Sequence, residues 1–280
     1  MAAALRIDAH QHYWSVDHAD YGWLKPVPAL APIYRDFGPR DLHPCLDAAG
    51  IDATVLVQAA PSEAETGRLL RLAAAPGSRV AGVVGWCEWL HPDAPQRIQR
   101  LAAQPLLKGL RPALHQMVRH GLVFDALIKG PAQLDALCEF AALHRALTIV
   151  LDHGAKPPIA EGARTGWAAG ISRLARCGNV WCKLSGLITE AGAGWTTDRL
   201  RPWVDHLLAE FGPQRLLWGS DWPVLNLAGS YARWWQASVE LLQPLSATQR
   251  EQVLGANAVR CYRLRQPERA VSNPGAALSP

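Results

Sequence analysis

The sequence predicts an α/β protein in which eight parallel strands alternate with helices, as in a (β/α)8 or TIM barrel. Three observations support this prediction. Short apolar runs alternate with helix-type segments along the 280 residues. The runs are continuous and mainly apolar, as expected for parallel strands that helices cover on the outside. Eight such units are the number that a TIM barrel contains.

The predicted strands are continuous apolar runs, which span 7–12, 53–58, 80–86, 106–111, 123–128, 146–153, 180–185 and 216–219. Helices are predicted between and after them, over 40–49, 63–75, 94–103, 133–144, 166–176, 198–211 and 231–242. Gly50 ends the first of these helices. A final helix is predicted to begin at Ser246, because Gln249 follows at the spacing of a capping box.

A doubly wound open sheet is the rival fold for the same alternation. No G-x-G-x-x-G or G-x-x-x-x-G-K-S/T motif follows a predicted strand, so the usual phosphate-binding signals of that fold are missing. We expect one domain over residues 1–265. Residues 266–280, which include several prolines and a glycine, are predicted to be a disordered tail.

Composition and charge argue against several classes of protein. Nearly half of the residues are apolar, but no apolar run approaches the length that spans a bilayer, so no membrane partner is predicted. The net charge of +4 is spread without a basic cluster, which argues against nucleic acid as a partner. Six cysteines without a C-x-x-C pair predict buried thiols in a reducing cytosol. The N-terminus lacks a basic signal-peptide region, so the cytoplasm is the predicted location.

A long loop over residues 13–38 follows the first predicted strand and is rich in aromatic residues and proline. Loops of this length within a domain are usually functional. The aromatic side chains, Trp14 among them, could form a roof over a pocket. They could equally anchor the loop to the rim of the barrel.

Polar side chains gather where the predicted strands end, which is the position of reactive groups in TIM barrels. His10 and His12 share one side of the first strand, because alternate strand residues point the same way. Asp221 follows the last strand, which neighbours the first in a closed barrel. These three residues, with His153 as a candidate fourth, form a nitrogen-and-oxygen ligand set that suits Zn²⁺ or Mn²⁺.

Two interpretations of this cluster remain open. A metal such as Zn²⁺ would lower the pKa of its water to about 7 and supply hydroxide at neutral pH. Asp221 could alternatively be the general base for that water, with or without a metal. In a purely structural interpretation, His10 and Asp221 are a hydrogen-bonded pair. The coincidence of polar residues at several strand ends favours catalysis.

Further candidates follow other strands. Arg111 can bind a carboxylate or a ring oxygen through its guanidinium, and His115 in the next loop could donate to substrate. Asp125 could pair with a neighbouring lysine or arginine, or contact substrate. Lys183 and Ser185 lie two residues apart on one strand and point to the same side, so both could reach the pocket. A cation there would polarise a carbonyl. No G-x-S-x-G motif supports a serine nucleophile.

Five stretches carry a resemblance to a known family: IDAHQHYW at 7–14, KGLR at 108–111, VLDHGAKPP at 150–158, KLSG at 183–186 and WGSDWP at 218–223. Together they resemble amidohydrolase family 2. Within it they are most similar to the branch of sugar-lactone hydrolases that includes L-fuconolactonases and L-rhamnonolactonases. The resemblance covers residues 5–263.

The resemblance implies an amidohydrolase-like TIM barrel that opens a sugar-derived lactone to the aldonic acid with an activated water. It implies that His10, His12 and Asp221 match the metal-site and base positions, and that His153 matches a further active-site histidine. Zinc is the implied metal. Manganese and metal-free catalysis stay open, since some relatives in the superfamily hydrolyse lactones without a metal.

Trp14 and Trp222 fit the rim of a sugar-binding pocket in such an enzyme. One departure is Pro131-Ala132-Gln133, which lacks a histidine that similar proteins often carry there. If that histidine contacts substrate in relatives, the sugar specificity differs in this chain. Two alternatives to a lactonase are a metal-dependent decarboxylase of an aromatic or unsaturated acid, and a non-catalytic barrel that binds sugar acids. Each has a small-molecule partner, and no oligomeric state is predicted.

Overall fold

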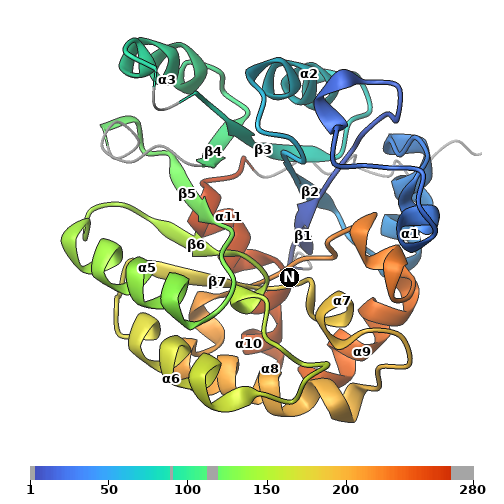
Figure 1. Ribbon diagram of the computed structural model, residues 1–280, viewed down its shortest axis with the longest axis vertical. Coiled ribbons are helices and arrows are strands. Elements are labelled where there is room, and N and C mark those ends of the chain that lie inside the picture. The colour runs from blue at the N-terminus through green and yellow to red at the C-terminus, as the bar shows by residue number, and fades with distance from the viewer. Residues whose placement is uncertain (1–3, 89–90, 112–118, 266–280) are drawn as a thin grey trace, which may run out of the picture.

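The computed structural model describes residues 4–88, 91–111 and 119–265. Eight parallel strands form one sheet in chain order, curled into a barrel (Figure 1). They are β1 (Ile7–Gln11), β2 (Ala53–Val57), β3 (Val80–Trp86), β4 (Leu107–Arg111), β5 (Val123–Ala126), β6 (Ile149–Leu151), β7 (Val180–Leu184) and β8 (Leu216–Trp218). The predicted TIM barrel is confirmed. The tail predicted over 266–280 and the candidate His115 lie outside the described residues.

Helices surround the barrel, and each begins and ends within two residues of its predicted bounds. They are α1 (Pro39–Ala49), α2 (Glu63–Ala74), α3 (Ala94–Ala102), α5 (Pro131–Leu143), α6 (Arg164–Ala175), α8 (Thr197–Phe211) and α9 (Tyr231–Leu241). The predicted capping box begins α10 (Ala247–Glu251), with Ser246 and Gln249 bonded reciprocally. A short helix, α7 (Leu187–Ala191), was not predicted, because a single turn leaves little periodicity in the sequence.

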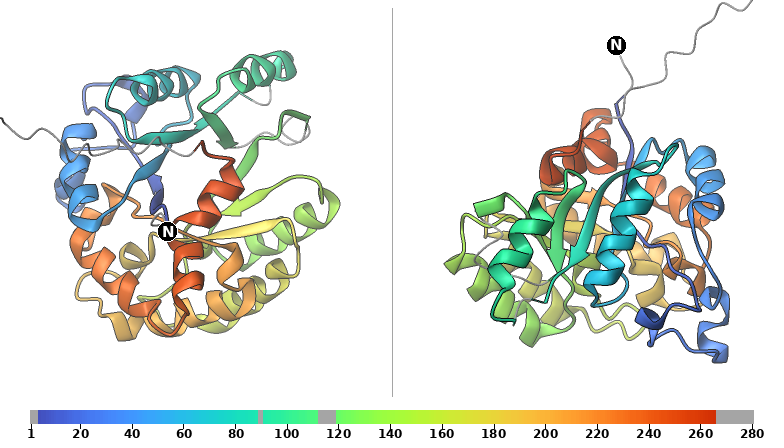
Figure 2. Two further views of the ribbon diagram at one scale, coloured as in Figure 1. Left: turned by 180° about the vertical axis from the view of Figure 1, so that it is seen from behind. Right: turned by 90° about the horizontal axis from the view of Figure 1, so that it is seen from above.

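The C-terminal helices cover one end of the barrel. After α10 the chain continues through a π-helical turn, Gln252–Ala256, into α11 (Asn257–Tyr262). Figure 2 shows these helices at the end opposite the loop that follows β1. Cys261 and Tyr262 of α11 pack against inward-facing strand residues, including Val55 and Val150, in a small apolar cluster inside the barrel. The end that carries the carboxyl ends of the strands therefore stays open.

The barrel closes between β1 and the residues that follow β8. The backbone N–H of Asp221 donates to the carbonyl of His10 at 2.8 Å, and that of His12 donates to the carbonyl of Trp222 at 2.7 Å. These bonds continue the sheet beyond Trp218, where β8 itself ends. The segment that closes the barrel thus contains one of the predicted site residues.

A fully buried carboxylate reinforces this closure. Asp8 accepts hydrogen bonds from the backbone N–H of Ser220 at 2.8 Å and of His10 at 3.2 Å. Its second oxygen accepts from the hydroxyl of Tyr231 on α9 at 3.0 Å. Asp8 therefore joins the first strand, the segment after the last strand and one outer helix.

A shift of register in β1 sets which side chains face inward. Asp8 pairs with Thr54 and Gln11 with Leu56, so three steps along β1 match two along β2. An extra residue of this kind moves the side chains that follow it to the opposite face of the sheet. Ala9 packs in the cluster inside the barrel, and the ring of the adjacent His10 also faces the interior groups of β7.

The loop over residues 13–38 contains two 3₁₀ turns, Ala19–Tyr21 and Pro28–Ile33. The indole N–H of Trp14 donates to the carbonyl of Arg35 at 3.0 Å, and Trp14 pairs by backbone hydrogen bonds with Phe37. Trp14 therefore anchors the loop, which was one of the two interpretations of its aromatic residues. No helix in the described part of the chain is both long and apolar enough to cross a membrane.

Candidate active site

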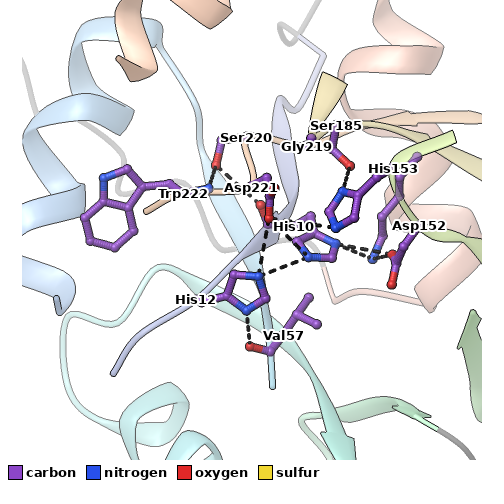
Figure 3. A network of polar contacts seen from close by, with 12 residues as sticks. His10, His12, Val57, Asp152, His153, Ser185, Gly219, Ser220, Asp221 and Trp222 are labelled. Carbon is purple, nitrogen blue, oxygen red and sulfur yellow. Dashed lines mark hydrogen bonds and ion pairs between the residues drawn. The ribbon is translucent and has the colours of Figure 1, made fainter. Parts of the chain in front are cut away.

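Three predicted site residues meet at the open end of the barrel (Figure 3). The Nε2 atoms of His10 and His12 lie 3.2 Å apart. Oδ1 of Asp221 lies 3.8 Å from Nε2 of His10 and 3.5 Å from Nε2 of His12. All three residues are buried. The two ends of the chain thus deliver two imidazoles and one carboxylate to a single point.

The spacing of these donor atoms fits one divalent metal ion. Tetrahedral zinc holds its nitrogen and oxygen ligands at about 2.0–2.2 Å, which places neighbouring donors roughly 3.3–3.6 Å apart. The observed separations of 3.2, 3.5 and 3.8 Å lie within about 0.2 Å of this range. Nδ1 of His12 donates to the carbonyl of Val57 at 2.8 Å, so its Nε2 keeps a lone pair for a metal.

His153 enters the site from a left-handed turn. β6 was predicted to extend to His153 but ends at Leu151. Four consecutive residues then have positive φ: His153 at 52°, Gly154 at 55°, Ala155 at 61° and Lys156 at 48°. The indole N–H of Trp167 on α6 donates to the carbonyl of Gly154 at 2.7 Å. Such conformations are costly outside glycine and concentrate at functional sites.

The His153 ring completes the cluster around Asp221. Its Nε2 lies 3.8 Å from Oδ1 of Asp221. Its Nδ1 lies 2.9 Å from Oγ of Ser185, which is fully buried behind the ring. Gly186 lies directly under the ring with φ of 64°, and a Cβ at that position would come within 2.7 Å of the imidazole. Ser185, predicted to bind substrate, thus contacts His153.

A buried ion-pair network lies beneath His10. Lys183 is fully buried, with Nζ 3.1 Å from Nδ1 of His10 and 3.0 Å from Oδ1 of Asp152. It also pairs with Asp125, the first of the two alternatives for that carboxylate. Arg111 pairs with the other oxygen of Asp152. Asp152 was missed as a site residue, although its place at the end of a strand, next to His153, was a usable signal.

Burial and neighbouring charges set the protonation of these groups. Burial lowers the pKa of His153 to about 4 and holds the pKa of His10 well below its usual value. Burial alone would raise the pKa of Asp221, but the facing histidines outweigh it and hold that pKa below its usual range. Burial alone would lower the pKa of Lys183, but its two carboxylate partners raise it. Neutral imidazoles beside a carboxylate are the forms that bind a metal.

The predicted tryptophans of the rim are buried. Trp14 is 4 % exposed and Trp222 is 3 % exposed, and the ring of Phe37 packs edge-on against both. Trp23, which was not predicted as a site residue, is 40 % exposed. Its indole N–H donates to the carbonyl of Ala59, just beyond β2, at 2.9 Å. Exposure cannot be inferred from a count of aromatic residues within one loop.

Comparison with known proteins gives consistent results. The profile of the Amidohydrolase family matches residues 7–116 and 111–264. The chain is 43% identical over 284 residues to an L-fucono-1,5-lactonase of Burkholderia ambifaria, covering 94% of this chain and 97% of that protein. It is 36% identical over 300 residues to an L-fucono-1,5-lactonase of Burkholderia multivorans, covering 94% and 98%. A crystal structure of an amidohydrolase from Burkholderia multivorans with bound zinc superposes with a TM-score of 0.85 at 36% identity, covering 94% of this chain and 100% of that one.

The contact between Gly186 and His153 predicts a specific effect of substitution. In Gly186→Ala the new Cβ sits on a residue with a left-handed backbone, and it also clashes with the His153 ring. Gly162→Ala is a matched control, because Gly162 has φ of 69° but open space around its Cβ position. We expect the control to lose about 1–2 kcal/mol of unfolding free energy. Gly186→Ala should lose about 1–3 kcal/mol more from overpacking, measured by urea denaturation. Equal losses in the two variants would contradict the packing argument.

Proposed function

The chain belongs to the amidohydrolase family, and from this premise we propose that it hydrolyses a sugar-derived lactone to the aldonic acid. The principal support is the cluster of His10, His12 and Asp221 in a chain that matches L-fucono-1,5-lactonases over nearly its whole length. The decarboxylase alternative is not favoured, because decarboxylase structures share the fold with this chain at only 15% and 18% identity, against 36% and 43% for the L-fucono-1,5-lactonases. A barrel that only binds sugar acids would not need the strained backbone that presents His153.

A divalent metal fits the site, and we propose zinc, held by Nε2 of His10, Nε2 of His12 and the carboxylate of Asp221. The zinc-bound relative at 36% identity favours zinc over manganese. When bound, zinc would polarise a carbonyl oxygen and lower the pKa of a water molecule. The hydrogen bond from His12 to Val57 and the contact between His10 and Asp152 fix the two rings for this purpose.

Asp221 is the proposed base. Its carboxylate accepts a proton from water as the water oxygen bonds to the lactone carbonyl carbon. The bond between that carbon and the ring oxygen then breaks, and Asp221 returns the proton to the departing ring oxygen. The products are a hydroxyl group and a carboxylic acid, which loses its proton to solvent.

His153 is the proposed donor to the developing oxyanion. If the hydroxyl of Ser185 donates to Nδ1, the ring keeps its proton on Nε2, the atom that faces Asp221 and the open end of the barrel. A neutral donor fixed in this way stabilises negative charge without reorganisation. The role proposed for Ser185 is therefore to set the tautomer of His153.

Arg111 and Trp23 are the proposed contacts for the sugar. Arg111 pairs with Asp152 and is 8% exposed, and the exposed part of its guanidinium is the proposed contact for a ring or hydroxyl oxygen. His115 stays a prediction for the loop beyond Arg111. Trp23 offers an exposed ring at the rim, whereas Trp14 and Trp222 support the loop.

Two broader predictions accompany this function. We propose that residues 1–265 form a single domain, in agreement with a single family profile that matches residues 7–116 and 111–264. The cytoplasm stays the predicted location, because all six cysteines are free thiols, as in a reducing compartment.

Replacement of the base should abolish most activity. Asp221→Asn keeps the shape of the side chain but cannot accept the proton, so kcat on an aldono-1,5-lactone should fall about 100- to 10,000-fold. Asp198→Asn, at an aspartate whose side chain is 92% exposed on α8, is the control and should match the wild type. A panel of aldono-lactones, with carbon dioxide release followed in parallel, distinguishes a lactonase from a decarboxylase. No turnover of any lactone by folded, zinc-loaded protein would refute the function.

Zinc binding should depend on the cluster. We expect one zinc per chain in the purified protein, measured by elemental analysis. His12→Ala should weaken zinc binding by more than the roughly 10- to 100-fold that loss of an outer-sphere partner costs. His91→Ala removes a histidine that is 47% exposed and lies outside the cluster, so its zinc affinity should be unchanged. Equal zinc affinity in both variants would exclude His12 as a ligand.

The pH dependence of kcat/KM should reveal the protonation of the His153 ring. Its pKa is lowered to about 4, so the ring stays neutral well below the pH at which an exposed histidine becomes charged. With zinc in excess, kcat/KM should be constant from pH 7 to about 5.5. It should fall as the pH approaches 4, because a charged His153 ring forms an ion pair with Asp221 and makes that carboxylate a weaker base. His153→Gln should be less active and should lack this acid limb. A wild-type limb centred near pH 6.5 would contradict the assignment.

A further inference from the structure

A chain of buried polar contacts connects α11, at the closed end of the barrel, with His10 at the open end. The hydroxyl of Tyr262 lies 2.9 Å from Oδ1 and 2.8 Å from Oδ2 of Asp125. Asp125 forms an ion pair with Lys183, whose Nζ lies 3.1 Å from Nδ1 of His10. None of the four residues is more than 1% exposed. We call these four residues the polar column.

The polar column is unusual for the inside of a barrel. TIM barrel interiors are normally filled by branched apolar side chains, as Val55, Val84 and Val150 do here. Buried charges are costly unless they are paired and hydrogen-bonded. A well-packed apolar set would often serve stability as well as such pairs do. The column ends on a ring of the active site, which indicates a purpose other than stability.

Each contact in the column restricts the next one. The Tyr262 hydroxyl spans both oxygens of Asp125 and so fixes the orientation of that carboxylate. Asp125 and Asp152 then hold Lys183 Nζ between them. Oδ1 of Asp152, which Lys183 contacts, also lies 3.3 Å from Nδ1 of His10 and is the group there that can accept its proton, because an ammonium can only donate. Nδ1 is the ring atom opposite Nε2, which faces His12 and Asp221. A partner fixed at one nitrogen of a ligating histidine orients the other nitrogen.

We propose that Tyr262 and Asp125 are positioning residues, which hold Nε2 of His10 in place from the closed end of the barrel. Both act through Lys183 and through the Asp152 carboxylate that Lys183 holds beside Nδ1 of His10, and neither is assigned a contact with substrate. The inference deepens the proposed function, and only its activity measurement rests on that function.

Tyr262→Phe tests the hydroxyl alone. The ring stays, together with its packing beneath Lys183, whose Nζ lies 5.4 Å from the ring centroid. We expect the imidazole ¹⁵N signals of His10 to shift in histidine-labelled protein, with His10→Asn identifying them. Zinc should bind about tenfold more weakly, at the lower end of the range for loss of an outer-sphere partner. At subsaturating zinc kcat should fall in parallel, while KM stays within twofold.

Tyr21→Phe is the matched control. It removes another buried tyrosine hydroxyl from a carboxylate, that of Glu65 at 2.8 Å, which lies outside the polar column. We expect its His10 signals and zinc dissociation constant to equal those of the wild type. Unchanged His10 signals and zinc affinity in Tyr262→Phe would overturn the proposal. So would the same changes in Tyr21→Phe, which would indicate a general effect of losing a buried hydroxyl.

Asp125→Asn tests the column one contact closer to His10. It keeps the side-chain shape and removes the charge. We expect the His10 signals to shift further, and zinc to bind more weakly, than in Tyr262→Phe. If both variants fail to fold, the column serves stability and the positioning role is withdrawn. The His10 signals and zinc affinity need no substrate, so failure of the wild type to hydrolyse lactones would refute the proposed function and leave this test intact.

Discussion

The structure depends on the joining of β1 to the segment after β8. Backbone hydrogen bonds link Asp221 to His10 and Trp222 to His12, and the buried carboxylate of Asp8 fixes Ser220 beside them. One set of contacts therefore closes the barrel and sets the separation of the imidazole and carboxylate donors. Because Asp221 has a left-handed backbone, its side chain turns towards the histidines of the first strand. Barrel closure and assembly of the site are the same event.

The architecture could be predicted from the sequence because its signals are local. Most strands are short runs rich in apolar residues, and several helices begin at a Ser or Thr cap, as α2, α8 and α9 do, or end at glycine, as α1 does. The meeting of His10 and His12 with Asp221 followed from barrel topology, which makes the first and last strands neighbours. Fold and cluster were therefore accessible without any knowledge of side-chain packing.

Other parts of the site depend on contacts between distant residues and left no local signal. The register shift in β1 exists only relative to β2. The left-handed turn at His153 requires Gly186 beneath the ring and a hydrogen bond from Trp167, and neither is adjacent in sequence. Tyr262 was not predicted as a site residue, yet it donates to a carboxylate on β5.

The bonds that Asp8 makes have a consequence for synthesis of the protein. Asp8 is separated in sequence from Ser220 by 212 residues and from Tyr231 by 223. While the chain leaves the ribosome, β1 therefore waits for most of translation with an unpaired edge and an unsatisfied carboxylate. Such long-range pairing slows folding and exposes partly folded chains to aggregation. The barrel can accordingly close only after most of the last quarter of the chain has been translated.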